Sequence, residues 1–158
     1  MTEIQHRLLK QFNNKLLSFV NQMIVFAPPD IKEIKILPTT LEFAINHGNP
    51  TIIINLFYEN LSLYASRIYQ DTPDRSLLEG DFIFNQLSGA LNRNKDRLDN
   101  DKFEVFTNVL QKDENKIKDH ICYTRNKWDE AGNNVQIKMW KDMQILLKLS
   151  EKYVQLTN

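Results

Sequence analysis

The chain has 158 residues, with 20 basic and 20 acidic side chains, so its formal net charge is zero. This length favours one domain spanning residues 1–158. A neutral chain lacks the general attraction to nucleic acid that a basic chain has, although a local basic patch is compatible with it. Composition therefore excludes a strongly basic nucleic-acid-binding protein, and its ordinary apolar content disfavours a disordered one.

The single cysteine, Cys122, and the short apolar runs indicate the cellular compartment of the protein. One cysteine forms no internal disulfide, which favours a reducing compartment. The longest apolar run near the N-terminus covers residues 23–27, far short of the roughly 20 residues that span a bilayer. We therefore expect a cytoplasmic protein without membrane insertion.

A first helix is predicted over residues 3–26. Thr2 and Gln5 have the spacing of a capping box, and Pro28 with Pro29 ends the helix. One face has apolar residues at helical spacing. They are Ile4, Leu8, Leu9, Phe12, Leu16, Phe19, Val20 and Met23.

A second, shorter helix is expected before Gly48. Asp30 is placed to cap a short turn, which Pro38 interrupts, and Thr39 or Thr40 is the candidate cap of the helix that follows. Gly48 stands where a helix C-cap glycine belongs.

Residues 50–69 predict a long third helix, although Ile52, Ile53 and Ile54 open it with strand-forming residues. Asn49 is a favoured N-cap and Pro50 a favoured first residue. A strand of this length would be far longer than usual. Apolar residues cover most of the circumference, which is typical of a buried central helix.

The second half of the chain is expected to be helical as well. Residues 70–80 form a turn, Asp81 caps a fourth helix, and residues 92–102 form an exposed connection. A fifth helix begins near Asp101, and the polar run at 112–119 either interrupts it or forms its solvated face. Gly132 ends it, and a last helix covers about 134–156. These elements predict an all-α, single-domain bundle of about five to six helices around the central helix at about 50–69.

Patterns of catalytic, cofactor and metal sites are lacking in the sequence. The four glycines are too far apart to build a phosphate-binding loop. His120 and Cys122 are the only close pair of metal-competent side chains, whereas a structural zinc site needs four ligands. We therefore predict no enzyme activity, no cofactor and no metal, with Cys122 in the core and His120 partly exposed.

Four lysines on the last predicted helix form the main candidate binding surface. Lys138, Lys141, Lys148 and Lys152 fall within about an 80° arc at 100° per residue. The arc is either the solvated face of an amphipathic helix or a surface that binds an anion or an acidic partner.

Aromatic residues gather between positions 58 and 84, and at helical spacing they favour core packing. The alternative is a partner-binding surface, for which the candidates are Tyr58, Tyr69 and Phe82.

Residues 26–85 resemble a pattern in small uncharacterised helical proteins of nucleocytoplasmic large DNA viruses. The resemblance rests on Asn49-Pro50, on Phe57 and Tyr64 within the helix, and on an acidic residue ahead of two phenylalanines. That last motif is Asp81, Phe82 and Phe84, and Ile83 separates its phenylalanines. The resemblance implies a viral protein of the host cytoplasm or virion, with a structural or interaction role and no transferable active site.

The sequence thus predicts a non-enzymatic helical protein that binds another protein, as a minor virion component of a large DNA virus. The alternative is a nucleic-acid-associated or regulatory factor that uses the four lysines. Partner identity and oligomeric state do not follow from the sequence.

Overall fold

The computed structural model describes residues 1–30, 35–75 and 114–157, and every regular element in these ranges is helical. The all-α class is therefore confirmed. The chain divides into two compact units, one formed by residues 1–73 with 131–158 and the other by residues 74–130. The helix predicted from Asp81, with Phe82, and the connection at 92–102 lie outside the described residues.

Helix α1 (Glu3–Met23) has the predicted capping box. The amide of Gln5 donates to the Thr2 hydroxyl, and the Thr2 amide donates to the Gln5 side chain at 2.7 Å. The helix tightens into a 3₁₀ turn at Ile24–Phe26, and Ala27 is extended because it precedes Pro28. The predicted helix at 3–26 is thus confirmed as an α-helix that ends in a 3₁₀ turn.

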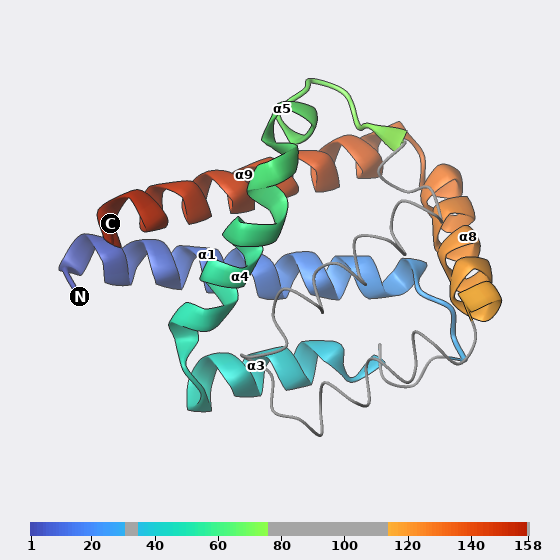
Figure 1. Cartoon of the computed structure of the whole chain (residues 1–158). Helices are drawn as coiled ribbons and strands as arrows, with labels where there is room; N and C mark the ends of the chain where they lie inside the picture. Colours follow the sequence, from blue (N-terminus) through green and yellow to red (C-terminus); the bar gives the residue numbers. More distant parts are fainter. Residues whose placement is uncertain (31–34, 76–113, 158) are drawn as a thin grey trace. The chain divides into compact units, whose positions relative to one another are not determined.

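Helix α9 (Asn133–Thr157) runs antiparallel to α1, and the two lie side by side along their whole length (Figure 1). Gln5 donates to the Leu156 carbonyl at 3.1 Å, and Lys138 donates to Gln22 at 3.0 Å. Low residue numbers on α1 therefore meet high numbers on α9. The core of this unit is built mainly on that pair, and its fully buried side chains include Phe12, Leu146, Leu147 and Ser150.

Helix α4 (Pro50–Leu61) crosses both members of this pair (Figure 1). Asn49 caps it by accepting from the Thr51 amide at 3.0 Å, as predicted. The predicted continuous helix at 50–69 is wrong, because a 3₁₀ turn at Ser62–Tyr64 separates α4 from α5 (Ala65–Ile68).

Burial of the 50–69 segment is also lower than predicted. Ile54 and Ile68 are its only buried residues, while Ile52 and Leu63 are exposed. Phe57 is half-buried against Phe12. The segment covers one side of the α1–α9 pair and is not the buried centre of the unit. Its apolar circumference misled the prediction because the number of neighbouring helices sets burial, and periodicity does not report that number.

Side chains of α9 fix the end of α5. The Trp140 indole donates to the Gln70 carbonyl at 2.8 Å, and Gln144 donates to the carbonyls of Ile68 and Gln70 at the same distance. These donors satisfy carbonyl groups that a helix leaves without partners at its C-terminus.

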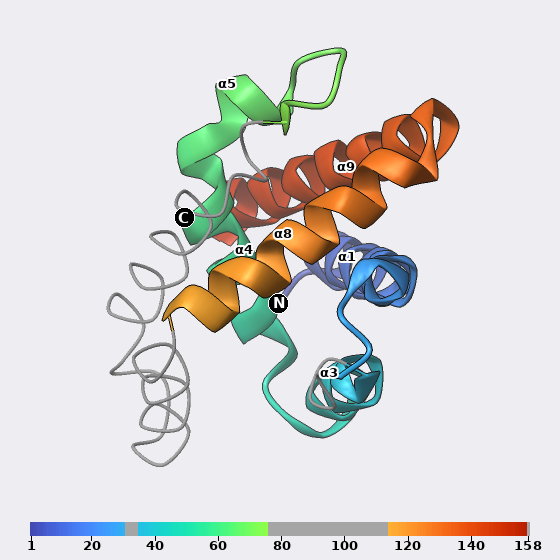
Figure 2. The same cartoon turned by 90° about the vertical axis from the view of Figure 1, so that its right-hand side faces the viewer.

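Helix α3 (Leu37–His47) begins earlier than predicted, with Pro38 inside its first turn, where proline is favoured. Gly48 is its C-cap, as predicted, with an extended backbone. A Cβ atom at Gly48 would lie 2.7 Å from the Ala44 carbonyl oxygen, so the close approach requires glycine. Figure 2 shows α3 next to α1, in agreement with their contacts. No residue of α3 is buried.

Helix α8 (Glu114–Ala131) is the described helix of the second unit. It ends before Gly132, which adopts φ +86 and thus the left-handed conformation that glycine favours. The predicted helix end at Gly132 is confirmed. None of the described helices is long and apolar enough to cross a membrane.

Candidate functional site

The outward side of α9 has a strip of exposed side chains in which lysines and aliphatic residues share one face. Successive members are three or four residues apart, so they lie above one another on the helix. The strip consists of Ile137, Lys141, Ile145, Lys148, Lys152 and Leu156. Its three aliphatic side chains are 40–49% exposed, which leaves a large share of their apolar surface in water.

Lys138 does not act with the other three predicted lysines. Its ammonium donates to Asp142, one turn away on α9, and to Gln22 on α1. Lys138 therefore helps to connect the two helices. Lys141, Lys148 and Lys152 are exposed and have no ion-pair partner among the described residues.

Asp142 is buried and joins two cations. Its carboxylate lies 2.7 Å from the Lys15 Nζ and 3.1 Å from the Lys138 Nζ. Burial by itself would raise the pKa of this carboxyl, but the hydrogen bonds and charges of the two lysines outweigh burial and hold the pKa below its usual value. Asp142 is thus a connection between α1 and α9, and it does not neutralise the exposed lysines.

The other acid of α9, Glu151, faces a different neighbour. Its carboxylate lies near the Tyr69 hydroxyl. Burial and the Glu151 carboxylate together raise the pKa of that hydroxyl. Tyr69 is exposed, Tyr58 is half-buried, and Phe82 lies outside the described residues. The described part of the chain therefore does not bring the three predicted aromatic residues together on one surface.

A shallow groove separates the exposed strip from α1. It is lined by Gln11, Asn14, Lys15 and Ser18 of α1 and by Ile145 and Leu149 of α9. Arg7 is exposed one turn before Gln11 on the same side of α1. We call the strip, the groove and Arg7 together the α1–α9 face.

Charge on this helix pair differs from charge on the whole chain. Helices α1 and α9 contain seven lysines and arginines and three acids, so seven minus three gives a formal charge of +4 in a neutral chain. Two of those acids are Asp142 and Glu151, which are engaged as described above. The third, Glu3, lies in the first turn of α1. The α1–α9 face is therefore a local positive region.

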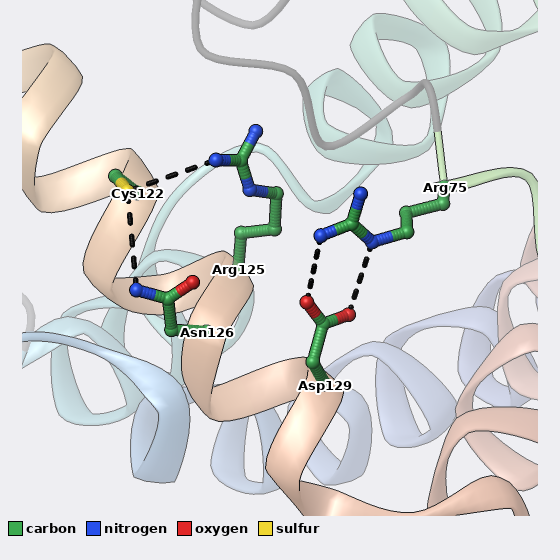
Figure 3. A network of polar contacts seen from close by, with 5 residues as sticks. All are labelled: Arg75, Cys122, Arg125, Asn126 and Asp129. Atoms are coloured by element: carbon green, nitrogen blue, oxygen red, sulfur yellow. Dashed lines mark hydrogen bonds and ion pairs between the residues drawn. The ribbon is translucent and has the colours of Figure 1, made fainter.

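The second unit holds a polar cluster on α8, shown in Figure 3. Arg75 donates to both carboxylate oxygens of Asp129, at 3.1 and 2.7 Å, and this hydrogen bonding lowers the pKa of the Asp129 carboxyl. Arg125 and Asn126 donate to the Cys122 sulfur at 3.7 and 3.9 Å.

Cys122 is exposed, so its predicted place in the core is wrong, whereas His120 is half-buried as predicted. Cys122 faces polar neighbours one turn further along α8, Arg125 and Asn126. Within the described ranges, no three histidine, cysteine or acidic side chains gather closely enough to hold a metal ion.

A second exposed apolar area lies on and beside α3. Phe43 is 66% exposed, and Ile36 and Leu37 are also exposed. Among the described residues, the only aromatic ring in contact with the Phe43 ring is that of His47, one turn away, with the ring centroids 4.7 Å apart. This area contains both Lys35 and Glu42, so it lacks the one-sided charge of the α1–α9 face.

Comparison with known proteins gives no relative: no family model matches the chain, and neither a curated protein nor a solved structure is significantly similar to it.

The ion pairs of Asp142 with Lys15 and Lys138 make the stability of the α1–α9 pair depend on pH at the acidic end. A carboxyl whose folded pKa is lowered stabilises the fold above its unfolded pKa, about 3.9, and loses that contribution as pH falls through the folded pKa. The urea midpoint of wild type is expected to drop more steeply between pH 4 and pH 2 than that of Asp142→Asn.

Asp71→Asn is the matched control for this measurement, because Asp71 is exposed. Its urea midpoint should follow the wild-type pH dependence. Equal pH dependence in wild type and Asp142→Asn would show that the Asp142 ion pairs do not stabilise the fold.

Proposed function

We propose that the protein is a non-enzymatic helical protein that acts by binding another protein, and that the α1–α9 face is its contact surface. The observation that carries the proposal is the exposed strip of α9, where three lysines that have no ion-pair partner among the described residues stand beside three partly exposed aliphatic side chains. The lysines give orientation and specificity, and the aliphatic side chains gain free energy when a partner removes them from water.

The charge of this surface favours a role in binding a partner protein over that of a helix face that only contacts water. A solvated helix face usually mixes both signs of charge, which favours solubility. Here the two acids of α9 face other neighbours, so the positive charge of the strip stays uncompensated by the described residues. A negatively charged protein surface would complement it.

A nucleic-acid-associated factor is the second candidate, and the three exposed lysines of the strip favour it. Each phosphate neutralised on duplex DNA lowers log affinity by about 0.9 per unit of log salt, so three lysines give a slope of about −2.7. Binding of single strands also uses aromatic groups for base stacking. Trp140 and Tyr153 of α9 are buried, so the strip offers no stacking group, and we rank this candidate second.

The viral assignment stays a prediction. It rests on the resemblance over residues 26–85, which includes Asn49-Pro50 and Phe57. A role as a minor virion component in the host cytoplasm would be one setting for the proposed protein contact.

Replacing the three lysines of the strip is expected to abolish partner capture. We expect the tagged wild-type chain to retain a protein partner from lysate of the source cells, and Lys141→Gln/Lys148→Gln/Lys152→Gln to lose at least about nine-tenths of it. The change removes charge without changing the fold, because all three side chains are exposed. Mass spectrometry of the retained proteins and circular dichroism of the variant provide the readout.

The matched control is Lys35→Gln/Lys116→Gln/Lys127→Gln, which removes the same charge outside the α1–α9 face and should retain the partner. Equal capture by both triple variants would reject the α1–α9 face as the contact surface. Submicromolar, salt-sensitive binding of DNA or RNA that only the α9 variant loses would place the second candidate first.

A further inference from the structure

The groove of the α1–α9 face has an apolar floor and a cationic rim. Ile145 and Leu149 form the apolar part, and polar side chains of α1 form the opposite wall. At 100° per residue, Lys141, Lys148 and Lys152 lie within about a 40° arc, while Ile145, Leu149 and Leu156 are turned from its centre by about 40–80°. That rotation is toward α1, because Ile145 and Leu149 share the groove with α1 residues.

This arrangement fits a helix as ligand. An amphipathic helix binds a groove by placing its apolar residues, spaced at i, i+3, i+4 and i+7, on the floor. The groove lies between α1 and α9 at residues 11–18 and 145–149, and the exposed strip continues along α9 on both sides of it. The charged side of such a ligand then lies against the lysine rim.

We propose that the α1–α9 face binds an acidic amphipathic helix of a partner protein, a proposal that rests on the proposed function as a protein-binding surface. Along α9, Lys148 follows Lys141 by seven residues and Lys152 follows Lys148 by four. At 1.5 Å per residue these steps are about 10 Å and 6 Å. A ligand helix that lies parallel or antiparallel to α9 can therefore pair with all three lysines if its own acidic residues are separated by seven and by four residues.

Charge disfavours a second copy of this chain as the occupant. Contact of two such faces would bring together two helix pairs that each have a formal charge of +4. Like charges placed against each other are destabilising and select against the wrong partner. An acidic helix removes the same apolar side chains from water and also neutralises the lysines.

The polar wall of the groove also favours a helix over an anionic membrane. A membrane-surface helix exposes its apolar residues on the side that enters the bilayer. Here Ile145 and Leu149 line a groove whose other wall is the polar set Gln11, Asn14 and Ser18. A bilayer would bury this polar wall together with Ile145 and Leu149, whereas a helix can pair with the wall through its own polar side chains.

The test is selection from a displayed library of helical peptides with randomised surface positions, using the full-length chain as bait. We expect enriched peptides to combine an aliphatic stripe with aspartate or glutamate along one flank. A chosen peptide should gain helicity on binding. Fluorescence anisotropy should show at least about tenfold weaker affinity for Lys141→Gln/Lys148→Gln/Lys152→Gln and for Ile145→Ser.

Two comparisons complete the experiment. A peptide of the same composition with its aliphatic residues dispersed around the helix should bind at least about tenfold more weakly. The Lys35→Gln/Lys116→Gln/Lys127→Gln variant should bind the selected peptide like wild type. Circular dichroism of each variant verifies that its helix content is retained.

Several outcomes would overturn the acidic-helix proposal: no enriched peptide, enriched peptides without acids, equal binding of the dispersed peptide, or undiminished binding to the α9 lysine variant. Lysine-dependent binding to vesicles of anionic lipid in place of peptides would assign the face to a membrane. The proposed function fails separately, when lysate capture does not depend on the three lysines. Lysine-dependent capture of a partner without an acidic helix would leave that function standing and reject only the ligand class.

Discussion

Phe12→Ala is expected to lower the free energy of unfolding by about 3–5 kcal/mol, the usual cost of truncating a fully buried aromatic side chain. Phe12 has 0% exposure. Its ring packs edge-on against Phe57 with the centroids 5.2 Å apart, a favourable aromatic geometry. The substitution leaves a cavity on α1 where α4 crosses it. Urea denaturation followed by circular dichroism at 222 nm would measure the loss.

Phe43→Ala is the control for this substitution, because Phe43 is the same residue type in an exposed position. Its cost should stay within about 0.5 kcal/mol, as for most surface changes. Similar stabilities of the Phe12 and Phe43 variants would mean that the α1 core is not built as described.

Leu146→Ala should cost about 2–5 kcal/mol, because the side chain is fully buried on α9 and its removal leaves a cavity. Leu146→Met conserves most of the volume and should cost less than about 1.5 kcal/mol. Differential scanning calorimetry of the three proteins would give the order wild type, Met variant, Ala variant in falling stability.

Leu156→Ala is the matched truncation on the exposed strip of the same helix, and we expect it to cost far less than Leu146→Ala. An equal cost at positions 146 and 156 would contradict the assignment of one buried and one exposed face to α9. The prediction is independent of partner binding, so it tests the fold alone.

Local signals in the sequence predicted most helix ends. The Thr2–Gln5 capping box, the Asn49 cap, Gly48 and Gly132 are each decided by residues within one turn. Pro38 shows the limit of such signals, because proline both ends helices and opens them. The interpretation as an interruption was wrong, and α3 includes Pro38 in its first turn.

Burial was harder to predict, because it depends on which helices meet. Ile4 and Met23 belong to the predicted apolar face of α1 but are exposed near its ends. Gln5 and Asn13 are polar yet buried. Gln5 is tolerated inside because it donates to the Leu156 carbonyl of α9, a partner 151 residues away that periodicity along α1 does not reveal.

The candidate site was predicted in part. Helical spacing placed Lys141, Lys148 and Lys152 together correctly, because they share one helix. The same spacing included Lys138, whose partner Gln22 comes from α1. The groove beside the lysines was missed, since four of its six lining residues lie on α1. Predicting the groove would have required knowing that the first and last helices pair in antiparallel fashion, and no local sequence pattern encodes that pairing.

Methyl NMR of the chain with its captured partner tests the central claim most directly, namely that the α1–α9 face is the contact surface. Selective labelling of isoleucine and leucine methyl groups reports every aliphatic residue of this face in one spectrum. We predict that partner addition shifts the methyl signals of Ile145, Leu149 and Leu156, and leaves the buried Ile54 and Ile68 signals in place. Shifts confined to Ile36 and Leu37, with the α9 methyl signals unchanged, would contradict the account and move the contact to the exposed apolar area beside α3.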